Sequence, residues 1–190
     1  NLPLWLNFIY KPGIKISKER DWNTKIQKII QEAPNWNIGI ISGVPSWVKL
    51  LIEKIIDYHH LDNIHDIWPN LSIYSHGGVS LKPYKDGLKK LMGKEVYFLE
   101  TYLASEGFIA YEKKANEGMS LILGNGIYYE FIPFDNKHFN TEGKLISSEG
   151  VVNYDSIKEG VEYALLMSTC SGAWRYLIGD TVMFSSLSPF

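Results

Sequence analysis

The spacing of apolar residues changes near Glu106, and this change constrains the fold more than any other feature of the sequence. Before Glu106, short apolar runs typical of strands alternate with stretches that place apolar residues at helical spacing. The strand-like runs are 37–42, 71–74 and 95–102, and the helical stretches are 19–33, 45–58 and 84–92. The alternation predicts parallel strands joined by right-handed crossovers, which makes residues 1–106 an α/β portion. In the helix that begins at Pro45, the expected buried stripe is Trp47, Leu51, Ile55 and Tyr58.

After Glu106 one strand-like run follows another, and some are separated by turns such as Gly124-Asn125-Gly126. These runs are Phe108–Glu112, Ser120–Leu123, Ile127–Ile132, Glu162–Thr169 and Trp174–Phe184. No helix-period stretch longer than 156–161 lies among them. We therefore expect an antiparallel β-rich portion over 107–190, within the same domain as 1–106.

The composition excludes several classes of protein. Apolar residues make up 45% of the chain and charged residues 21%, so the chain can bury a core. The net charge is −2 and no Lys/Arg run tracks a phosphate backbone, so no nucleic-acid partner is expected. No apolar stretch approaches the roughly 18 residues of a membrane span and no signal peptide is visible, so we expect a cytoplasmic protein. The single cysteine, Cys170, fits a reducing compartment and is expected to be buried in a strand.

The two ends of the chain do not resemble natural termini. The sequence starts at Asn1 without a methionine and stops at Phe190, soon after the strand-like run 181–184. We therefore interpret the chain as a fragment of a longer enzyme.

The first candidate motif is Ser75–Leu81, which follows a predicted strand and contains the pair Gly77-Gly78. Glycines at the carboxyl end of a parallel strand let the backbone approach a flat ligand closely. The alternative is a tight β–α turn that needs glycine only for its backbone angles.

The second motif is Glu100–Phe108, at the end of the third predicted strand. A hydroxyl beside a carboxylate on such a loop can hold a phosphate oxygen and Mg²⁺, because hard cations prefer oxygen ligands. Tyr102 offers a ring on which a base could stack. The alternative is a surface loop with a solvated glutamate.

The third motif is Trp174–Asp180, in which Asp180 is expected to follow a strand that ends at Gly179. A carboxylate can accept two hydrogen bonds from the cis-diol of a ribose. The alternative is an ordinary Gly-Asp β-turn.

The order and spacing of the three motifs resemble the adenylate-forming enzymes, which include acyl-CoA synthetases and luciferases. In that superfamily a strand-end Gly-Gly-Ala-Pro-Leu is followed by Tyr-Gly-x-Thr-Glu and then by Tyr-Arg-Thr-Gly-Asp. The corresponding segments here are Gly77–Leu81, Tyr102–Glu106 and Trp174–Asp180.

A finer resemblance is to the Gretchen Hagen (auxin-conjugating) acyl-acid amido synthetases. Tyr129-Glu130-Phe131-Ile132-Pro133 resembles a Tyr/Phe-Glu-Phe-Ile/Leu-Pro segment of that family, and Gly43–Trp47 and Glu162–Leu165 are also similar to it. The resemblance implies the central part of a large adenylating domain. It also implies that ATP activates an acyl acid, with Mg²⁺, and that an amine such as an amino acid then takes the acyl group.

The resemblance implies roles for individual residues. Ser105 would touch the α-phosphate, Glu106 would hold Mg²⁺, and Asp180 would bind the ribose hydroxyls. The other nucleotide-binding residues would be Gly77, Gly78, Val79, Thr101, Tyr102, Tyr129 and Phe131. The acyl pocket would draw on Trp47, Val48 and His76.

The sequence departs from the family pattern at two positions. In the amido synthetases the second motif usually reads Tyr-x-Ser-Ser-Glu, and Ala104 replaces its first serine. The third motif of the plant-like pattern begins Tyr-Arg-Tyr-Arg, and Leu177 replaces its second arginine. The Ser/Thr/Gly-rich phosphate loop and the C-terminal catalytic lysine of these enzymes are also not found, so the fragment alone is expected to be inactive. A ligase that delivers the acyl group to a thiol such as coenzyme A, and an inactive homologue that acts as a binding module, remain alternatives.

Three histidines, His59, His60 and His65, follow or end a predicted helix. Their spacing matches no zinc pattern, so solvated or capping roles are expected.

Overall fold

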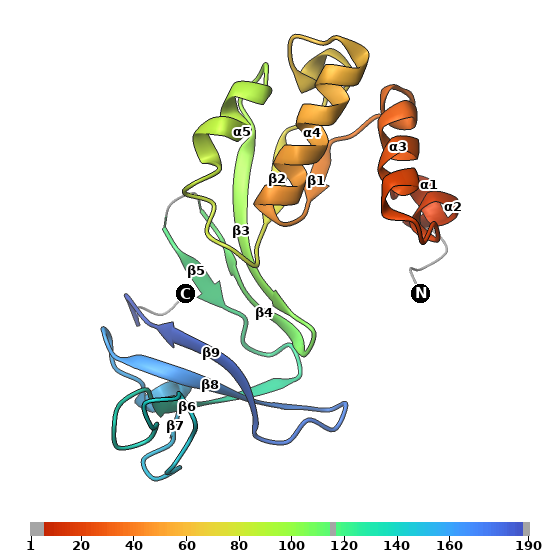
Figure 1. Ribbon diagram of the computed structural model, residues 1–190. Helices are drawn as coiled ribbons and strands as arrows, with labels where there is room; N and C mark the ends of the chain where they lie inside the picture. The colour runs from red at the N-terminus through yellow and green to blue at the C-terminus, as the bar shows by residue number, and fades with distance from the viewer. Residues whose placement is uncertain (1–5, 115–116, 188–190) are drawn as a thin grey trace. The chain divides into compact units, whose positions relative to one another are not determined.

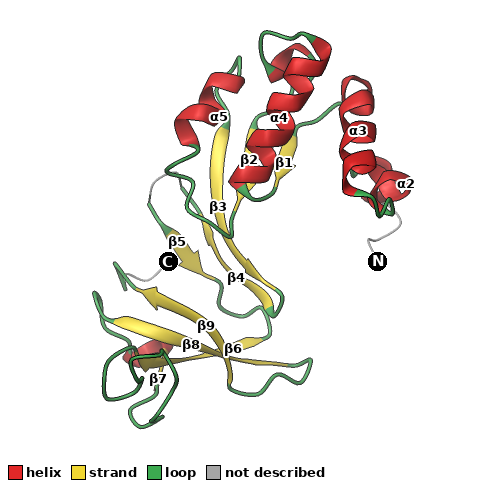
Figure 2. Cartoon of the chain, in the orientation of Figure 1, coloured by secondary structure: helices red, strands yellow, loops and turns green. Residues whose placement is uncertain are grey.

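The computed structural model describes residues 6–114 and 117–187, except for the side chains of Asn7 and Phe8 (Figure 1). It divides into two compact units. The first comprises Asn1–Leu103 with Ile109–Leu121, and the second Ala104–Phe108 with Ile122–Phe190. Parallel strands with helices dominate the first unit and antiparallel strands the second, which confirms the predicted fold class (Figure 2).

The sheet of the first unit has the strand order β1-β2-β3-β4-β5. Its strands are β1 (Ile40–Ser42), β2 (Ile73–His76), β3 (Tyr97–Ala104), β4 (Gly107–Glu112) and β5 (Met119–Leu121). β1, β2 and β3 pair in parallel, and β5 pairs antiparallel to β4. The predicted crossovers are therefore present, and β1 is the edge strand beside them.

Helices precede or connect the parallel strands. They are α1 (Leu6–Ile9), α2 (Gly13–Ser17), α3 (Trp22–Glu32), α4 (Pro45–His59) and α5 (Lys85–Leu91), with the 3₁₀ turns η1 (Ala33–Asn35) and η2 (Ile64–Asp66). The Asp21 side chain accepts a hydrogen bond from the Thr24 backbone at 2.8 Å and so begins α3. α4 begins at Pro45, which needs no hydrogen bond at that position, and ends before His60 in a left-handed conformation.

The expected buried stripe of α4 was wrong in part. The buried side chains are those of Pro45, Val48, Ile52 and Ile55, whereas Trp47 and Tyr58 are each about half exposed. α4 is apolar at so many positions that two adjacent stripes have similar spacing, and the sequence does not decide which of them faces the sheet.

Side-chain hydrogen bonds link segments that pack in the core of the first unit. Trp68 is 2% exposed, and its Nε1 donates to the Ala33 carbonyl at 2.9 Å. His65 is also buried, and both of its ring nitrogens have partners: Nε2 lies 2.9 Å from the Leu71 carbonyl and Nδ1 accepts from the Gly93 backbone at 3.0 Å. His65 is thus a structural residue. In 6–114 and 117–187 no three His, Cys, Asp or Glu side chains gather as metal ligands.

The sheet of the second unit has the order β7-β6-β8-β9, and its strands are all antiparallel. They are β6 (Ile127–Pro133), β7 (Val152–Asn153), β8 (Glu162–Thr169) and β9 (Tyr176–Met183), and η3 (Tyr154–Ser156) follows β7. Alternate residues of β6 and β8 pack on opposite faces: Ile132, Ala164 and Leu166 join Phe139 on one face, and Phe131 contacts Tyr163 on the other.

Two expectations for the end of this unit were wrong. β9 begins at Tyr176, so Trp174 and Arg175 lie in the preceding turn. Cys170 is exposed, because it follows the last residue of β8 and starts that turn. No helix among the described residues is long and apolar enough to cross a membrane.

The Trp68 hydrogen bond gives a test of the first unit's core. We expect Trp68→Phe to lower the free energy of unfolding by about 1–3 kcal/mol, because the change removes the bond to Ala33 and leaves a small cavity. Trp174→Phe is the matched control, since Trp174 is 78% exposed. Urea denaturation measures both, and an equal effect of the two substitutions would contradict the assignment.

Candidate functional site

The carboxyl ends of β1 and β2 meet at a pair of glycine turns. The Gly43 backbone donates to the Ser75 carbonyl at 3.1 Å, and the Tyr74 hydroxyl donates to the Gly43 carbonyl at 3.0 Å. β2 continues into Gly77 and Gly78, and Gly78 has a φ of +82°. Ligands of open α/β sheets bind outside the carboxyl ends of parallel strands. These turns are therefore the candidate site of the first unit.

Gly77 has no space for a side chain. A methyl group there would overlap the backbone carbonyl oxygen of Thr101 in β3. The Thr101 hydroxyl donates to the His76 carbonyl at 2.9 Å on the same side. The glycines thus form the tight turn of the alternative interpretation, and binding of a flat ligand by their bare backbone stays a prediction. Thr101, predicted to bind nucleotide, uses its hydroxyl to hold this turn.

His76 is the buried polar residue of this site. It is 3% exposed and lies opposite Glu100 in the β2–β3 register. Its Nδ1 is the one buried side-chain polar atom without a hydrogen-bond partner in 6–114 and 117–187. Burial holds the pKa of His76 below its ordinary value, although Glu100 and Glu112 act in the opposite direction and Lys85 adds to the decrease. A neutral imidazole here keeps an unused hydrogen-bonding atom.

The other predicted residues of the first unit differ in exposure. Val48 is buried in α4, and its Cγ2 lies 3.0 Å from where a Gly43 Cβ would be. Trp47 is 55% exposed and meets the Trp22 ring edge-on at 5.3 Å between centroids. Val79 is 46% exposed beyond the glycine turn, and Tyr102 is half-buried in β3.

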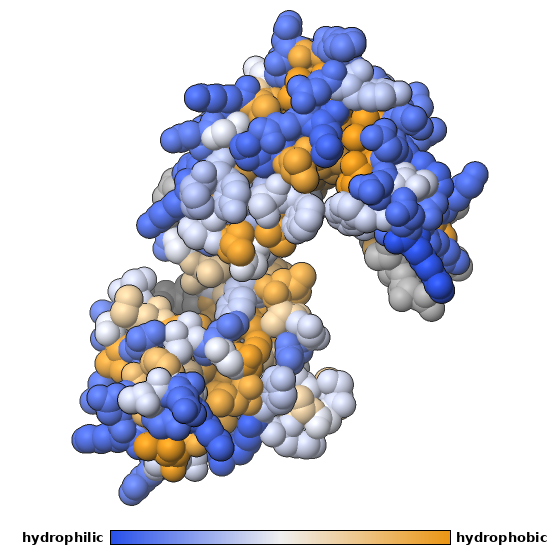
Figure 3. Space-filling view, viewed as in Figure 1, coloured by the Kyte–Doolittle hydropathy of each residue, from blue (hydrophilic) through white to orange (hydrophobic). Residues whose placement is uncertain are grey.

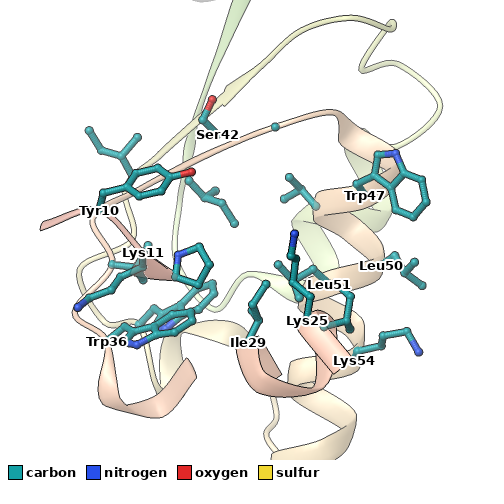
Figure 4. A pocket seen from close by; sticks show the side chains of 18 of the residues that line it. Tyr10, Lys11, Lys25, Ile29, Trp36, Ser42, Trp47, Leu50, Leu51 and Lys54 are labelled. Atoms are coloured by element: carbon teal, nitrogen blue, oxygen red, sulfur yellow. The ribbon is translucent and has the colours of Figure 1, made fainter. Parts of the chain in front are cut away.

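A cavity of about 1020 Å³ lies in the first unit against α3, α4 and β1 (Figure 4). Its lining includes Trp47 and Val48 but not His76. Of the three predicted acyl-binding residues, two therefore line this cavity.

In the second unit, the turn that carries Ser105 and Glu106 is held against β6. A side chain at Gly107 would lie 2.5 Å from Ile127 Cδ1, and Asn125 Nδ2 donates to the Phe108 carbonyl at 2.9 Å. Ser105 is exposed and Glu106 half-buried. The contacts fix the backbone of the turn and leave both side chains at the surface.

Asn125 was not predicted as a site residue, yet it links this turn to Tyr129. Its Nδ2 also lies 3.4 Å from the Tyr129 hydroxyl. Tyr129 is 4% exposed, and burial raises its pKa. The signal that could have identified Asn125 is its place in Gly124-Asn125-Gly126, because asparagine side chains often hydrogen-bond backbone groups in turns.

Two of the family-like segments are joined by an ion pair that the sequence did not predict. Arg175 Nε donates to Glu130 Oε2 at 3.1 Å. Arg175 has a φ of +45°, which is uncommon for a residue other than glycine, and its backbone donates to Ser168 Oγ at 2.9 Å.

Asp180 lies at a different place in its strand than predicted, whereas Phe131 lies in the predicted strand. Asp180 does not follow a strand but lies within β9, beyond Gly179, and is exposed. The β8–β9 register shifts near this point, between Ala164 and Leu166, which the sequence pattern did not reveal. Phe131 is fully buried and packs edge-on against Tyr163 and Phe184.

Some of the predicted residues thus lie together in each unit. The first gathers His76, Gly77, Gly78 and Thr101, and the second gathers the Ser105-Glu106 turn and Tyr129. The binding roles of these residues stay predictions.

Comparison with known protein families matches both units. Residues 1–96 match the profile of the GH3 family N-terminal domain, and residues 120–189 match that of the GH3 family central domain.

Three plant proteins are similar to the chain over part of their length. The probable indole-3-acetic acid-amido synthetase GH3.6 of Oryza sativa subsp. japonica is 28% identical over 127 residues, which are 63% of this chain and 25% of that protein. The jasmonoyl–L-amino acid synthetase JAR6 of Nicotiana attenuata is 29% identical over 63% of this chain and 21% of its own. The indole-3-acetic acid-amido synthetase GH3.2 of Arabidopsis thaliana is 26% identical over 90% of this chain and 29% of its own. The chain spans about a quarter of the length of these relatives.

Two solved structures share the fold. The GH3.15 acyl acid amido synthetase has a TM-score of 0.58 at 14% identity, over 88% of this chain and 38% of its own. A 2-hydroxyisobutyryl-CoA ligase has a TM-score of 0.56 at 15% identity, over 84% of this chain and 34% of its own.

The Gly77 contact gives a test of the strand-end geometry. We expect Gly77→Ala to lower the free energy of unfolding by about 1–3 kcal/mol, because the new methyl group must displace the Thr101 backbone. Gly39→Ala is the matched control, since its nearest atom would lie at 3.8 Å. Urea denaturation of both variants measures the difference. Equal stability of Gly77→Ala and the unmodified chain would show that the turn is not tight.

Proposed function

Because the chain belongs to the GH3 family, we propose that it is part of an enzyme that activates a carboxylic acid with ATP and joins the acyl group to an amine, such as an amino acid. The observation that carries the proposal is the match of both units to successive domains of one family, over 1–96 and 120–189. The names of the plant relatives, which are amido synthetases and an amino acid synthetase, support the choice of an amine acceptor.

The proposed reaction follows from the chemistry of a carboxylate, which is a poor electrophile. A carboxylate oxygen attacks the α-phosphorus of ATP, and the bond to the β-phosphate oxygen breaks to release pyrophosphate. The amine then attacks the acyl carbonyl, AMP leaves with the carboxylate-derived oxygen, and the amine loses a proton. No protein nucleophile is needed, so the enzyme contributes positioning and charge stabilisation.

In the first unit, the proposed role of Gly77, Gly78 and Val79 is to form one wall for the adenine. Support comes from the bare backbone at Gly77 and the exposed side chain of Val79. Tyr102 would stack on the base. Thr101 would act on the nucleotide indirectly, because its hydroxyl holds the His76 carbonyl.

In the second unit, Ser105 and Glu106 would face the phosphates and Asp180 the ribose hydroxyls. Magnesium is commonly bound through one or two carboxylates together with substrate phosphates, so a single surface carboxylate on a fixed turn fits the ion. Glu106 meets this requirement, since Gly107 and Asn125 hold its turn in place. Bound Mg²⁺ would supply positive charge against the phosphates.

The acyl acid would contact Trp47, Val48 and His76 in this proposal. Val48 and His76 are buried, and the unused Nδ1 of His76 offers a hydrogen bond to a polar substrate group or a water molecule.

The location of the protein in the cytoplasm also stays an expectation.

The test needs a full-length protein, as long as the relatives, that includes these 190 residues. We expect it to exchange pyrophosphate into ATP when given Mg²⁺ and a panel of aryl and fatty acids. Exchange reports the first half-reaction alone. Amino acids and coenzyme A, added separately, then distinguish an amide product from a thioester. Folded full-length protein that shows no exchange with any acid would refute the adenylation proposal.

We expect Asp180→Ala and Glu106→Gln to impair different steps. Asp180→Ala should weaken ATP binding by about 1.5–3 kcal/mol, the scale of hydrogen bonds to a charged group. Glu106→Gln should lower kcat more than ATP affinity, because charge that develops in the transition state is then less stabilised. Calorimetry and steady-state kinetics separate the two effects, with Asp155→Ala, an exposed aspartate of η3, as the control. Identical phenotypes would mean that these roles are assigned wrongly.

A further inference from the structure

The outer edge of β1 presents backbone groups that the described residues do not pair. Gly39 accepts from Ile73 at 3.3 Å and Gly43 donates to Ser75 at 3.1 Å, so these two residues face β2. In a parallel ladder alternate residues face the same neighbour. The N–H and C=O groups of Ile40 and Ser42 therefore point away from β2, where 6–114 and 117–187 provide no strand.

These backbone groups border an apolar cavity rather than a polar surface. The cavity of about 1020 Å³ against α3, α4 and β1, here called the β1 groove, is lined by Ile40 and Ser42 themselves. Its aromatic lining is Tyr10, Trp22, Trp36, Trp47 and Trp68. Figure 3 shows apolar surface between α3 and α4. Backbone donors and acceptors beside such a surface form a template for another strand.

The charges around the β1 groove have one sign. Its charged lining residues are Lys11, Lys25 and Lys54, and none of the lining residues is acidic. In Figure 4 Lys25 extends into the hollow, whereas Lys54 points away from it. A second copy of the chain docked groove to groove would bring these lysines together, so charge favours an occupant with a carboxylate.

We propose that the β1 groove accepts an extended strand of the same protein, from sequence outside these 190 residues. That strand pairs with the backbone of Ile40 and Ser42, places apolar side chains in the groove, and carries a carboxylate near Lys25. Main-chain pairing identifies the occupant as polypeptide, because a row of alternating donors and acceptors matches another strand. The relatives supply a source within one polypeptide, since the chain spans 25% of the rice protein.

The test uses overlapping peptides of about 15 residues, long enough for one strand, that cover the whole rice sequence. Fluorescence anisotropy of each labelled peptide measures binding to the 190-residue chain. Amide hydrogen exchange, followed by NMR, then locates the contact. We expect a peptide from outside the aligned quarter of the rice protein to slow exchange at Ile40 and Ser42 by about tenfold or more. The amides of Ile41 and Gly43 should change little, because they already face β2.

Two variants and one control test the two features of the groove. Ser42→Pro removes an outward N–H at an edge position, where proline is tolerated, and should weaken peptide binding at least about tenfold. Lys25→Glu should weaken binding of a peptide that carries a carboxylate by a similar factor. Lys15→Glu makes the same charge change on α2, outside the lining, and should leave affinity unchanged. Circular dichroism establishes that each variant is folded.

Several outcomes would overturn the proposal. It fails if no peptide protects Ile40 and Ser42, if only peptides from the aligned quarter do so, or if Lys25→Glu and Lys15→Glu have equal effects. Protection of the two amides in a dimer of the chain, measured by light scattering without peptide, would instead assign the groove to a second copy. The experiment needs neither ATP nor an acyl acid, so its result is independent of the proposed activity.

Discussion

The close approach of Gly77 to the Thr101 backbone is the constraint on which the candidate site of the first unit depends. β2 and β3 run in parallel with His76 opposite Glu100, so the chain leaving β2 must pass directly over β3. Only glycine leaves space for that path, and the Thr101 hydroxyl then satisfies the His76 carbonyl at 2.9 Å. The contact brings bare main chain to the strand ends, and a planar ligand can approach bare main chain closely.

The order of elements could be predicted because each depends on local spacing and punctuation. Pro45 at the start of α4 and Gly77 after β2 are local signals, and both lie where the sequence placed them. The face of α4 that is buried could not be predicted, since Trp47 and Val48 are adjacent apolar residues and only the sheet decides between them. The exposure of Cys170 depended likewise on where β8 ends.

Polar pairs between residues far apart in the chain could not be predicted from the sequence, for a different reason. Asn125 and Tyr129 are only four residues apart, yet the Asn125 bond to Phe108 spans 17 positions and forms because the β3–β4 turn packs on β6. The ion pair of Arg175 with Glu130 spans 45 positions. No periodicity encodes such pairs, because they follow from how the strands meet. The motifs nevertheless singled out the segments that contain Glu130 and Arg175.

The packing of Leu177 gives a physical account of one departure from the family pattern. Leu177 lies in β9 where the resemblance would place a second arginine, and it packs against the core cluster of Ile132, Ala164 and Leu166. An arginine there could lay its aliphatic stem along the same surface, but its guanidinium would need to reach water or a carboxylate. Glu130 already accepts a hydrogen bond from Arg175, so the two arginines of the plant-like pattern would have to share this carboxylate or bind different acceptors. Leucine instead contributes its whole side chain to the core, and Arg175 alone keeps the contact that joins the third motif to β6.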